Sequence, residues 1–432
     1  MSTGARAVVP VAGPLDATVV VPGSKSLTNR ALVCAALAGG TSTLDGALVA
    51  DDTVAMREAL AALGAGIAED PATGRLTVTG TGGRLRAGPL DLDMRQSGTT
   101  SRFLLPVVAL GTGEYRIDGA GPLRARPMGP VLDGIRALGA AVRPEGEPGH
   151  LPVTVVAPGR LDGGAVTVAG DASSQFLSGL LLAAPYCRDG VRLSLSTALV
   201  SRPYVELTVA TMRAFGVDVA GRPGECDLVV PAARYRPGAH TVEPDASTAS
   251  YFLAAAALVG GRVTVAGLGA GTGQGDARFA DLLAAMGARV ERTDRSTTVV
   301  GTGRLAGPGT VDLSDMPDMA QTLAALAPFA DGPTEVTGVG FIRGHETDRI
   351  AAVVAELTRL GVDARATDDG FVVRPGTPRG ARVATYDDHR MAMSFALVGL
   401  RVPGVEIEDP NCVAKTFPGY WEALDGLRAP RQ

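Results

Sequence analysis

The chain is poor in lysine, cysteine and aromatic residues. Of its 40 basic residues only two, Lys25 and Lys415, are lysines, so arginine carries almost all of the positive charge. Aromatic residues make up 4% of the chain, and there are four histidines. The formal net charge is −5, whereas proteins that bind nucleic acids or anionic membranes are usually basic. The composition therefore argues against nucleic-acid and membrane partners.

Long apolar runs are also missing. The longest, such as 176–184 and 251–259, fall well short of the roughly 20 residues that a membrane-spanning helix needs. The N-terminus has no basic segment followed by an apolar one, so the sequence predicts no signal peptide and a cytoplasmic location. The four cysteines, at 34, 187, 226 and 412, form no C-x-x-C pair. This spacing favours buried thiols over disulfides, a zinc site or a nucleophile.

The scarcity of lysine singles out the two that remain. Arginine can replace lysine wherever positive charge is enough, but not where a compact ammonium that can lose its proton is needed. Lys25 follows a predicted strand and a turn at Pro22 and Gly23, and a helix is expected to open near Ser26 or Thr28. A helix N-terminus suits an anion such as phosphate, although a capped helix with an exposed lysine is the alternative. The spacing of a Walker A motif is absent.

Two sets of glycines recur with a common period. An apolar, helix-like run ends at a glycine six times, at Gly39, Gly111, Gly190, Gly260, Gly332 and Gly404. An offset set, in which a large apolar residue precedes the glycine, lies at Gly64, Gly139, Gly216, Gly287 and Gly361. In both sets the glycine is predicted to end a helix. The period of roughly 70 residues indicates six copies of an α/β unit that reads strand, helix, strand, helix, strand.

The length and the repeat predict more than one lobe. A chain of 432 residues exceeds a typical single core, so two lobes of three units are favoured, while three lobes of two remain open. The pattern breaks at 235–238, which places a boundary around Arg234 to Glu243. The strand before Lys25 precedes the first full unit and is a candidate to pack with the last. The glycine-rich segment 267–275 lacks dinucleotide-binding spacing and is interpreted as a turn.

Polar segments interrupt the pattern where several apolar runs begin. They are 96–102, 124–127, 171–175, 201–204, 315–318, 343–349, 387–390 and 414–416. Taken singly, each is typical of a helix cap with a solvated arginine. At equivalent places in a repeat, they are predicted to converge into one anion site built from backbone N–H groups, hydroxyls and arginines.

Nine segments carry a resemblance to a known family. They are PGSKSLTNRAL (22–32), GTTSR (98–102), RPMG (126–129), DASSQF (171–176), SRPY (201–204), DASTASYFL (245–253), ETDR (346–349), DHRM (388–391) and KTF (415–417). In this order they resemble the 3-phosphoshikimate 1-carboxyvinyltransferases, or EPSP synthases, of the enolpyruvyl transferase family. The resemblance implies a two-lobe inside-out α/β barrel with three β-α-β-α-β-β units per lobe. It assigns 1–23 plus 244–432 to one lobe and 24–243 to the other, with the active site in the cleft between them.

The resemblance also implies a reaction. The enolpyruvyl group of phosphoenolpyruvate passes to the 5-hydroxyl of shikimate 3-phosphate through a tetrahedral addition-elimination intermediate, and phosphate is released. This step belongs to the shikimate pathway to chorismate and the aromatic amino acids, and it is the target of glyphosate. The expected partners are these two small molecules, with no cofactor and no metal, and the expected state is a monomer.

The same resemblance assigns the site residues. Those expected to bind shikimate 3-phosphate are Lys25, Ser26, Arg30, Ser173, Ser174, Gln175, Ser201, Tyr204, Asp318 and His345. Those expected to bind phosphoenolpyruvate are Lys25, Gly98, Arg126, Gln175, Arg349, Arg390 and Lys415. Asp318 matches the family's base, Glu346 matches its proton donor, and Lys25 completes the catalytic set. Gln96, Thr99 and His389 are expected to support the site. These residue types suit the task, because arginine forks grip phosphates and carboxylates and glycine lets backbone approach a ligand.

Three positions depart from the family pattern. The family often has Asn where Gln96 and Phe341 stand and Lys where His345 stands, which bears on affinity more than on the reaction. A paralogue that uses another cyclitol acceptor therefore remains an alternative.

Two further alternatives are weaker. A catalytically silent binder of phosphorylated ligands is predicted to lack Lys25, Asp318 or Glu346, and all three are present. The sister transferase acting on UDP-N-acetylglucosamine has a catalytic cysteine in the loop before its Arg-Pro, and the matching loop 121–127 has none.

Overall fold

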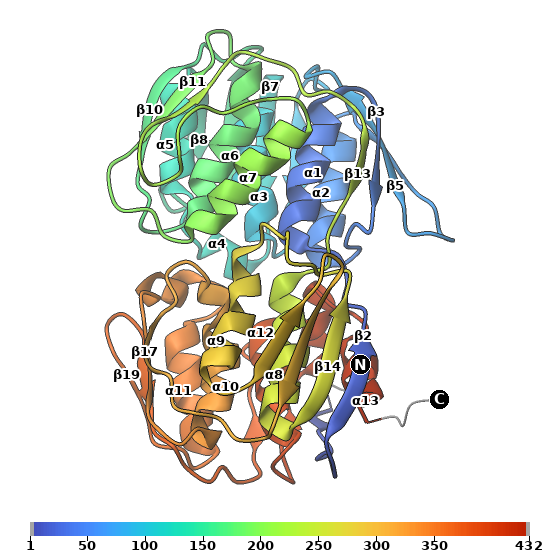
Figure 1. The fold of residues 1–432 in the computed structure, drawn as a ribbon. Helices are drawn as coiled ribbons and strands as arrows, with labels where there is room; N and C mark the ends of the chain where they lie inside the picture. The colour runs from blue at the N-terminus through green and yellow to red at the C-terminus, as the bar shows by residue number, and fades with distance from the viewer. Residues whose placement is uncertain (1–3, 429–432) are drawn as a thin grey trace. The chain divides into compact units, whose positions relative to one another are not determined.

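The computed structural model describes residues 4–428 (Figure 1). Contacts divide the chain into two compact units. Gly23–Val242 form the N-terminal unit, and Met1–Pro22 with Glu243–Gln432 form the C-terminal unit. The chain therefore crosses between the units twice, so the C-terminal unit contains the first strands of the protein.

Among the described residues, three sheets form the N-terminal unit. One joins β13 (Ala239–Thr241), β3 (Gly39–Asp45), β5 (Leu76–Thr81) and β4 (Gly66–Glu69) in that order. A second joins β6 (Leu90–Asp93), β7 (Thr112–Asp118), β9 (Val153–Pro158) and β8 (Ala141–Pro144), and a third joins β10 (Gly164–Val168), β11 (Val191–Leu195) and β12 (Leu228–Val230). In each sheet the first pair is parallel and every later pair is antiparallel.

The C-terminal unit repeats this pairing pattern. Its described sheets join β2 (Leu15–Val19), β14 (Gly261–Ala266), β16 (Ser296–Gly301) and β15 (Arg289–Arg292); β17 (Gly309–Asp312), β18 (Thr334–Thr337), β20 (Phe371–Val373) and β19 (Ala364–Ala366); and β21 (Arg382–Val383), β22 (Glu406–Ile407) and β1 (Arg6–Ala7). Again one parallel pair is followed by antiparallel pairs. The strand before Lys25 is β2, which pairs with β14, while β1 pairs with the last strand, β22.

Six helices lie buried inside the units. They are α1 (Lys25–Leu37), α3 (Gly98–Val108) and α6 (Ser174–Ala183) in the N-terminal unit, and α8 (Ala246–Val259), α10 (Ala320–Leu326) and α12 (His389–Gly399) in the C-terminal unit. Every residue of α3, α10 and α12 is buried, as expected for helices that are apolar on almost all faces. Figure 1 shows strands on the outside of the helices in each unit.

The remaining helices are shorter or have an exposed face. The α-helices are α2 (Asp51–Ala62), α4 (Gly121–Arg124), α5 (Gly129–Ala137), α7 (Arg202–Ala214), α9 (Phe279–Ala285), α11 (Arg349–Arg359) and α13 (Tyr420–Gly426). The 3-10 helices are η1 (Ala184–Tyr186), η2 (Gly275–Arg278), η3 (Pro317–Met319), η4 (Ala327–Phe329), η5 (Gly340–Gly344) and η6 (Pro410–Lys415). No described helix is both long enough and apolar enough to cross a membrane.

The three buried helices of the C-terminal unit meet at equivalent hydroxyls. Oγ1 of Thr322 in α10 lies 3.4 Å from Oγ of Ser250 in α8 and 3.4 Å from Oγ of Ser394 in α12. The two residues of each pair are 72 positions apart in the sequence. Small side chains here let the helices approach closely. The hydroxyls also partner one another where an unpaired polar atom would be costly.

The two glycine sets end helices in different ways. All five glycines of the offset set have positive φ directly after a helix, for example 107° at Gly64 and 108° at Gly139, so their predicted role is confirmed. In the first set only Gly260 caps a helix, α8, as predicted; Gly111, Gly190, Gly332 and Gly404 lie beyond the cap of the preceding helix, so their predicted role is wrong. The helix α1 ends at Leu37 with Ala38 as its cap, and Gly39 already belongs to β3. The prediction for Gly39 is therefore wrong, because the helix passes directly into an extended strand.

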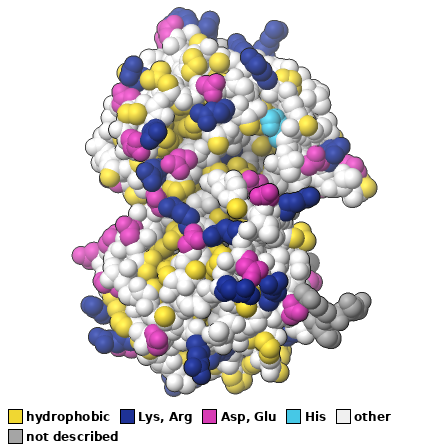
Figure 2. Space-filling view, in the orientation of Figure 1, with side chains coloured by type: hydrophobic (Ala, Val, Ile, Leu, Met, Phe, Trp, Pro, Cys, Tyr) yellow, Lys and Arg dark blue, Asp and Glu magenta, His cyan; other side chains and the backbone are white. Residues whose placement is uncertain are grey.

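The prediction of buried thiols is confirmed for Cys34 and Cys187 and is wrong for Cys226. All four cysteines are free; Cys34 and Cys187 are buried, Cys412 is half-buried and Cys226 is exposed. Figure 2 shows acidic and basic side chains interspersed over the visible face of each unit. Segment 267–274 is a turn between β14 and η2, as predicted.

Candidate active site

Most of the predicted polar segments lie at helix N-termini, as the sequence suggested. The N-cap residues are Ser97 of α3, Ser173 of α6, Ser201 of α7, Asp348 of α11 and Asp388 of α12. The side chains of Ser97 and Asp388 accept hydrogen bonds from the backbone N–H groups of Thr100 and Arg390. This capping satisfies N–H groups that a helix leaves open and holds the adjacent functional side chains in place.

Lys25 is the first residue of α1 and pairs with a carboxylate on the next helix. Its Nζ lies 3.1 Å from Oδ2 of Asp52 in α2, and the two side chains are 15% and 6% exposed. A half-buried ammonium at the start of a helix is a suitable anchor for an anion. Asp52 has no motif of its own, so the sequence reasoning missed it.

Arg30 is buried and ties α1 to α7. Its Nε donates to Oγ1 of Thr208, and its two terminal nitrogens donate to the carbonyl oxygens of Ser26 and Tyr204, each at 2.8 Å. Burial lowers the pKa of Arg30 to about 10. Because three of its N–H groups serve protein oxygens, Arg30 holds Ser26 and Tyr204 in place, and its other N–H groups are those that can serve a ligand.

A second group connects α3 with α6. Arg102 donates through Nη1 to Oε1 of Gln175 at 3.0 Å and to Oγ of Ser173 at 3.3 Å, and Nε2 of Gln175 lies 3.3 Å from Oγ1 of Thr99. The predicted residues Thr99, Ser173 and Gln175 are thus brought together, and Ser174 follows as the first, buried residue of α6. Arg102 lies in a recognised segment but was not predicted to act in the site.

Gly98 and Arg126 are in direct contact. A Cβ added to Gly98 would lie 2.7 Å from Cζ of Arg126, so the guanidinium packs flat against the start of α3. Gln96 lines a neighbouring cavity of about 600 Å³, together with Arg95, Arg116 and Arg124. Each of these three arginines is paired with a carboxylate.

Ser201 adopts the left-handed conformation, with φ 54° and ψ 41°, directly before α7. A non-glycine residue pays a cost of about 1 kcal/mol or more for this backbone. Ser201 is buried, and Tyr204 lies in the first turn of α7, three positions later. Strain of this kind is common at functional sites.

In the C-terminal unit the predicted residues gather around Arg349. Its guanidinium donates from Nη1 to Asp318 at 2.9 Å, from Nη2 to Glu346 at 2.8 Å and from Nε to Asp388 at 2.8 Å. Burial by itself lowers the pKa of Arg349, but the three carboxylates outweigh it and raise the pKa above its usual value. The predicted base and the predicted proton donor are therefore held by one buried cation.

Two more cations complete this cluster. Nη2 of Arg390 lies 2.6 Å from Oδ2 of Asp318, and Nζ of Lys415 lies 3.1 Å from Oε1 of Glu346. Arg390 also lies 3.4 Å from the hydroxyl of Tyr251, and burial raises the pKa of that hydroxyl to about 12. The cluster thus places three cations against three carboxylates, so an anionic ligand competes with Asp318 and Glu346 for the same donors.

The histidines of this unit lie at the edge of the cluster. Nδ1 of His345 is 3.2 Å from Nη1 of Arg349, and the ring of Phe341 packs edge-on against His345 with centroids 5.8 Å apart. His389 is buried beside Asp388, with 3.6 Å between Nδ1 and Oδ1. His345 therefore joins the cluster directly, whereas His389 flanks it.

Asp276 is a buried carboxyl that the sequence reasoning did not single out. It is 4% exposed and accepts a hydrogen bond from Oγ of Ser247, at the start of α8. Burial, followed by the charge of Asp318, raises its pKa to about 7. Asp276 belongs to η2, at the end of the glycine-rich turn that offered no motif.

Comparison with known proteins decides the family. The family model described as EPSP synthase (3-phosphoshikimate 1-carboxyvinyltransferase) matches residues 10–424. The chain belongs to the EPSP synthase family. It is 46% identical over 409 residues to the 3-phosphoshikimate 1-carboxyvinyltransferase of Nostoc punctiforme, covering 94% of this chain and 95% of the relative. It is 45% identical over 423 residues to that of Laribacter hongkongensis, covering 96% and 97%.

Solved structures agree. The EPSP synthase of Acinetobacter baumannii matches with a TM-score of 0.81 and 27% identity over 98% of each chain. The enolpyruvyl transferase NikO of Streptomyces tendae shares the fold, with a TM-score of 0.77, 21% identity and coverage of 98% of this chain and 97% of NikO. The EPSP synthase family match spans both units, so both residue groups lie within the region that the family shares.

Proposed function

We propose that this chain transfers the enolpyruvyl group of phosphoenolpyruvate to the 5-hydroxyl of shikimate 3-phosphate and releases phosphate. The observation that carries the proposal is the convergence of Asp318 and Glu346 on the buried Arg349, flanked by Arg390 and Lys415. Two carboxylates supply the proton transfers that the reaction needs, and three cations suit a substrate with both a phosphate and a carboxylate.

The proposed chemistry has two stages. Asp318 takes the proton of the 5-hydroxyl while the oxygen of that hydroxyl attacks C2 of phosphoenolpyruvate. Glu346 delivers a proton to C3. The tetrahedral adduct then loses phosphate and a proton from C3 to restore the enol ether. Cations around the adduct stabilise the phosphate as it leaves, since fixed charges in a buried site cost little reorganisation.

The binding groups are proposed from both units. Lys25, Gly98, Arg126 and Gln175 join Arg349, Arg390 and Lys415 around phosphoenolpyruvate. Ser26, Arg30, Ser173, Ser174, Ser201 and Tyr204 hold shikimate 3-phosphate with Lys25, Gln175, Asp318 and His345, and Gln96, Thr99 and His389 support the site. The contacts within each unit, such as Gln175 with Thr99 and Arg126 with Gly98, support this assignment.

We further propose the family's architecture for the chain. Residues 1–23 plus 244–432 and residues 24–243 form two lobes of an inside-out α/β barrel, the substrates bind in the cleft between the lobes, and the chain acts as a monomer. Three β-α-β-α-β-β units per lobe are supported by the shared strand pairing of the six described sheets and by the 72-residue spacing of the buried hydroxyls.

The test uses purified protein, shikimate 3-phosphate and phosphoenolpyruvate without added metal. We expect phosphate release that requires both substrates, and a product whose mass equals the acceptor plus the carboxyvinyl group. The Asp318→Asn variant is expected to be about 10²–10⁴-fold slower, because the base is lost. The matched control is Asp315→Asn, which removes a half-buried carboxylate paired with Arg278 and is expected to retain full activity.

Two outcomes would overturn the proposal. One is the absence of a carboxyvinyl product although binding of both substrates is detected by calorimetry, which would point to another acceptor. The other is equal turnover by Asp318→Asn and Asp315→Asn, which would remove Asp318 from the chemistry.

A further inference from the structure

A second cavity lies at the other end of the buried helices of the N-terminal unit. It has a volume of about 590 Å³ and is lined by Gly39, Gly82, Tyr186, Gly216, Ala233, Arg234, Tyr235, Arg236 and Pro237. Gly39 follows the C-terminal end of α1, whereas Lys25 begins that helix of 13 residues. At 1.5 Å per residue the two ends are about 20 Å apart. This distal pocket, as we call it, is therefore separate from the Lys25 end.

The charge of the distal pocket is unbalanced. Of the described residues that line it, two are arginines and none carries a carboxylate. Among residues 4–428, neither Arg234 nor Arg236 makes an ion pair, although most arginines of the chain do. The cavity beside Gln96 is of similar size, yet its three arginines are all neutralised by Glu58 and Asp118. The distal pocket thus retains positive charge in a chain whose net charge is −5.

The two guanidinium groups are positioned by their surroundings. The Cζ atom of Arg234 lies 4.6 Å from the centroid of the Tyr186 ring, and Gly83 leaves room for both, since a Cβ there would lie 2.4 Å from the ring. Arg236 packs on Gly216, where a Cβ would lie 2.9 Å from its Cδ. A stacked arginine keeps its edge donors available, and such arginines are well suited to bidentate recognition.

The floor of the pocket is held by hydrogen bonds of Tyr186. The hydroxyl of Tyr186 donates to the carbonyl of Leu37 and accepts from the backbone of Tyr235 at 3.3 Å. Burial raises the pKa of Tyr186 to about 12, so the phenol stays neutral. The ends of α1 and α7 contribute a partial negative charge of about half a unit each, which is less than the two arginines supply.

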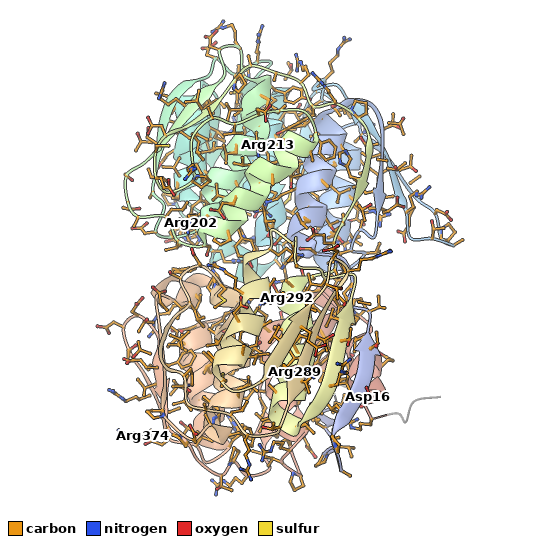
Figure 3. All side chains as sticks on the ribbon, in the orientation of Figure 1. Asp16, Arg202, Arg213, Arg289, Arg292 and Arg374 are labelled. Carbon is orange, nitrogen blue, oxygen red and sulfur yellow. The ribbon has the colours of Figure 1, made fainter. Side chains whose placement is uncertain are left out.

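We propose that the distal pocket binds a small anion that carries a phosphate group, through Arg234 and Arg236. The volume is in the range of small-molecule pockets, and two guanidinium forks match the oxygens of a phosphate. This site is independent of the proposed reaction, because its residues lie at the opposite ends of α1 and α7 from Lys25 and Ser201. Figure 3 labels Arg213 near the end of α7 that precedes Gly216 and Arg202 at the end that follows Ser201.

The test measures where inorganic pyrophosphate binds. Hydrogen exchange with mass spectrometry on the full chain is expected to show slower exchange in segments 79–87 and 231–240 when pyrophosphate is added. Calorimetry of the Arg234→Gln/Arg236→Gln variant is expected to show that pyrophosphate binds the distal pocket at least about tenfold more weakly than in the unmodified protein. The matched control Arg192→Gln/Arg213→Gln removes two exposed arginines that are paired with Asp227 and Asp218, and it is expected to bind as the unmodified chain does.

Two results would overturn the proposal. One is that pyrophosphate does not slow hydrogen exchange in segments 79–87 and 231–240 of the unmodified protein. The other is equal local protection in the Arg234→Gln/Arg236→Gln variant. Thermal unfolding of both double variants establishes that they are folded, which is expected because all four arginines are exposed.

Discussion

Single side chains set the properties of the C-terminal cluster. Arg349 is 1% exposed and contacts Asp318, Glu346 and Asp388 together, so loss of any one partner leaves a buried charge uncompensated. The same arrangement keeps the two proposed proton carriers in fixed positions. Arginine suits this role because its planar fork can serve several carboxylates at once.

The lysine count identified residues that the structure places in such clusters. Lys25 pairs with Asp52 and Lys415 pairs with Glu346, and both lysines are largely buried. A compact ammonium fits beside one carboxylate oxygen where a guanidinium would need a wider space. This is a physical reason for lysine at these two positions in a chain whose other basic residues are arginines.

The contact of Gly98 with Arg126 predicts that a larger residue at position 98 weakens the binding of phosphoenolpyruvate. Gly98→Ala places a methyl group 2.7 Å from Cζ of Arg126, so the guanidinium must move. Steady-state kinetics are expected to show a KM for phosphoenolpyruvate raised about tenfold with a smaller change in kcat, because binding geometry is disturbed more than proton transfer. Gly129→Ala is the control, since a Cβ there meets nothing within 4 Å. An unchanged KM in Gly98→Ala would show that Arg126 does not bind phosphoenolpyruvate.

At the scale of elements, helix ends decide where functional groups point. The N-caps Ser97, Ser173 and Asp388 orient the first turns of α3, α6 and α12, and these turns carry Gly98, Gln175 and Arg390. The helices α7 and α11 also begin at site N-caps, Ser201 and Asp348, and at their opposite ends Gly216 and Gly361 have positive φ and turn the chain. The same helices can therefore present donors at one end while closing tightly at the other.

Alanine substitutions in the two glycine sets are expected to change stability by different amounts. Gly64 has φ 107° while Gly39 has no positive φ, and a Cβ at either position meets nothing closer than 3.7 Å. Gly64→Ala is therefore expected to destabilise the fold by about 1–2 kcal/mol through its backbone alone, which lowers Tm by about 2–8 °C. Gly39→Ala is expected to leave Tm nearly unchanged. Equal Tm values for the two variants in calorimetric unfolding would contradict this account.

For the whole molecule, Asp276 couples stability to pH. Its pKa of about 7 in the fold lies above the ordinary value of 3.8, because burial and Asp318 disfavour its charged form. Its stabilising contribution is therefore complete below about pH 4 and is lost as the pH rises toward 7. The groups that face it are Asp318, Arg390, Asp245 and Ser247.

Asp276→Asn tests this coupling. The amide cannot ionise and still offers an oxygen to Ser247, so the Tm of the variant relative to the unmodified protein is expected to increase as the pH rises from about 4 to above 7. The measurement is thermal unfolding across that range. A Tm difference that does not depend on pH would show that Asp276 does not titrate as described.

The α/β class of the fold, the family and the residue types of the candidate site could all be predicted from the sequence. Periodic glycines and apolar runs report helices and strands because these features depend on local backbone preferences. The motifs report the family because they are specific when taken together and their order spans the chain.

The partners that these residues contact could not be predicted from the sequence. Asp52, Asp276 and Arg102 contact or face predicted residues across separate elements, and no local pattern encodes such neighbours. Within residues 4–428, the lack of an ion pair at Arg234 and Arg236 is likewise visible only once the loops fold beside Tyr186. Ion pairs and pockets arise from distances through space, whereas a sequence pattern records only spacing along the chain.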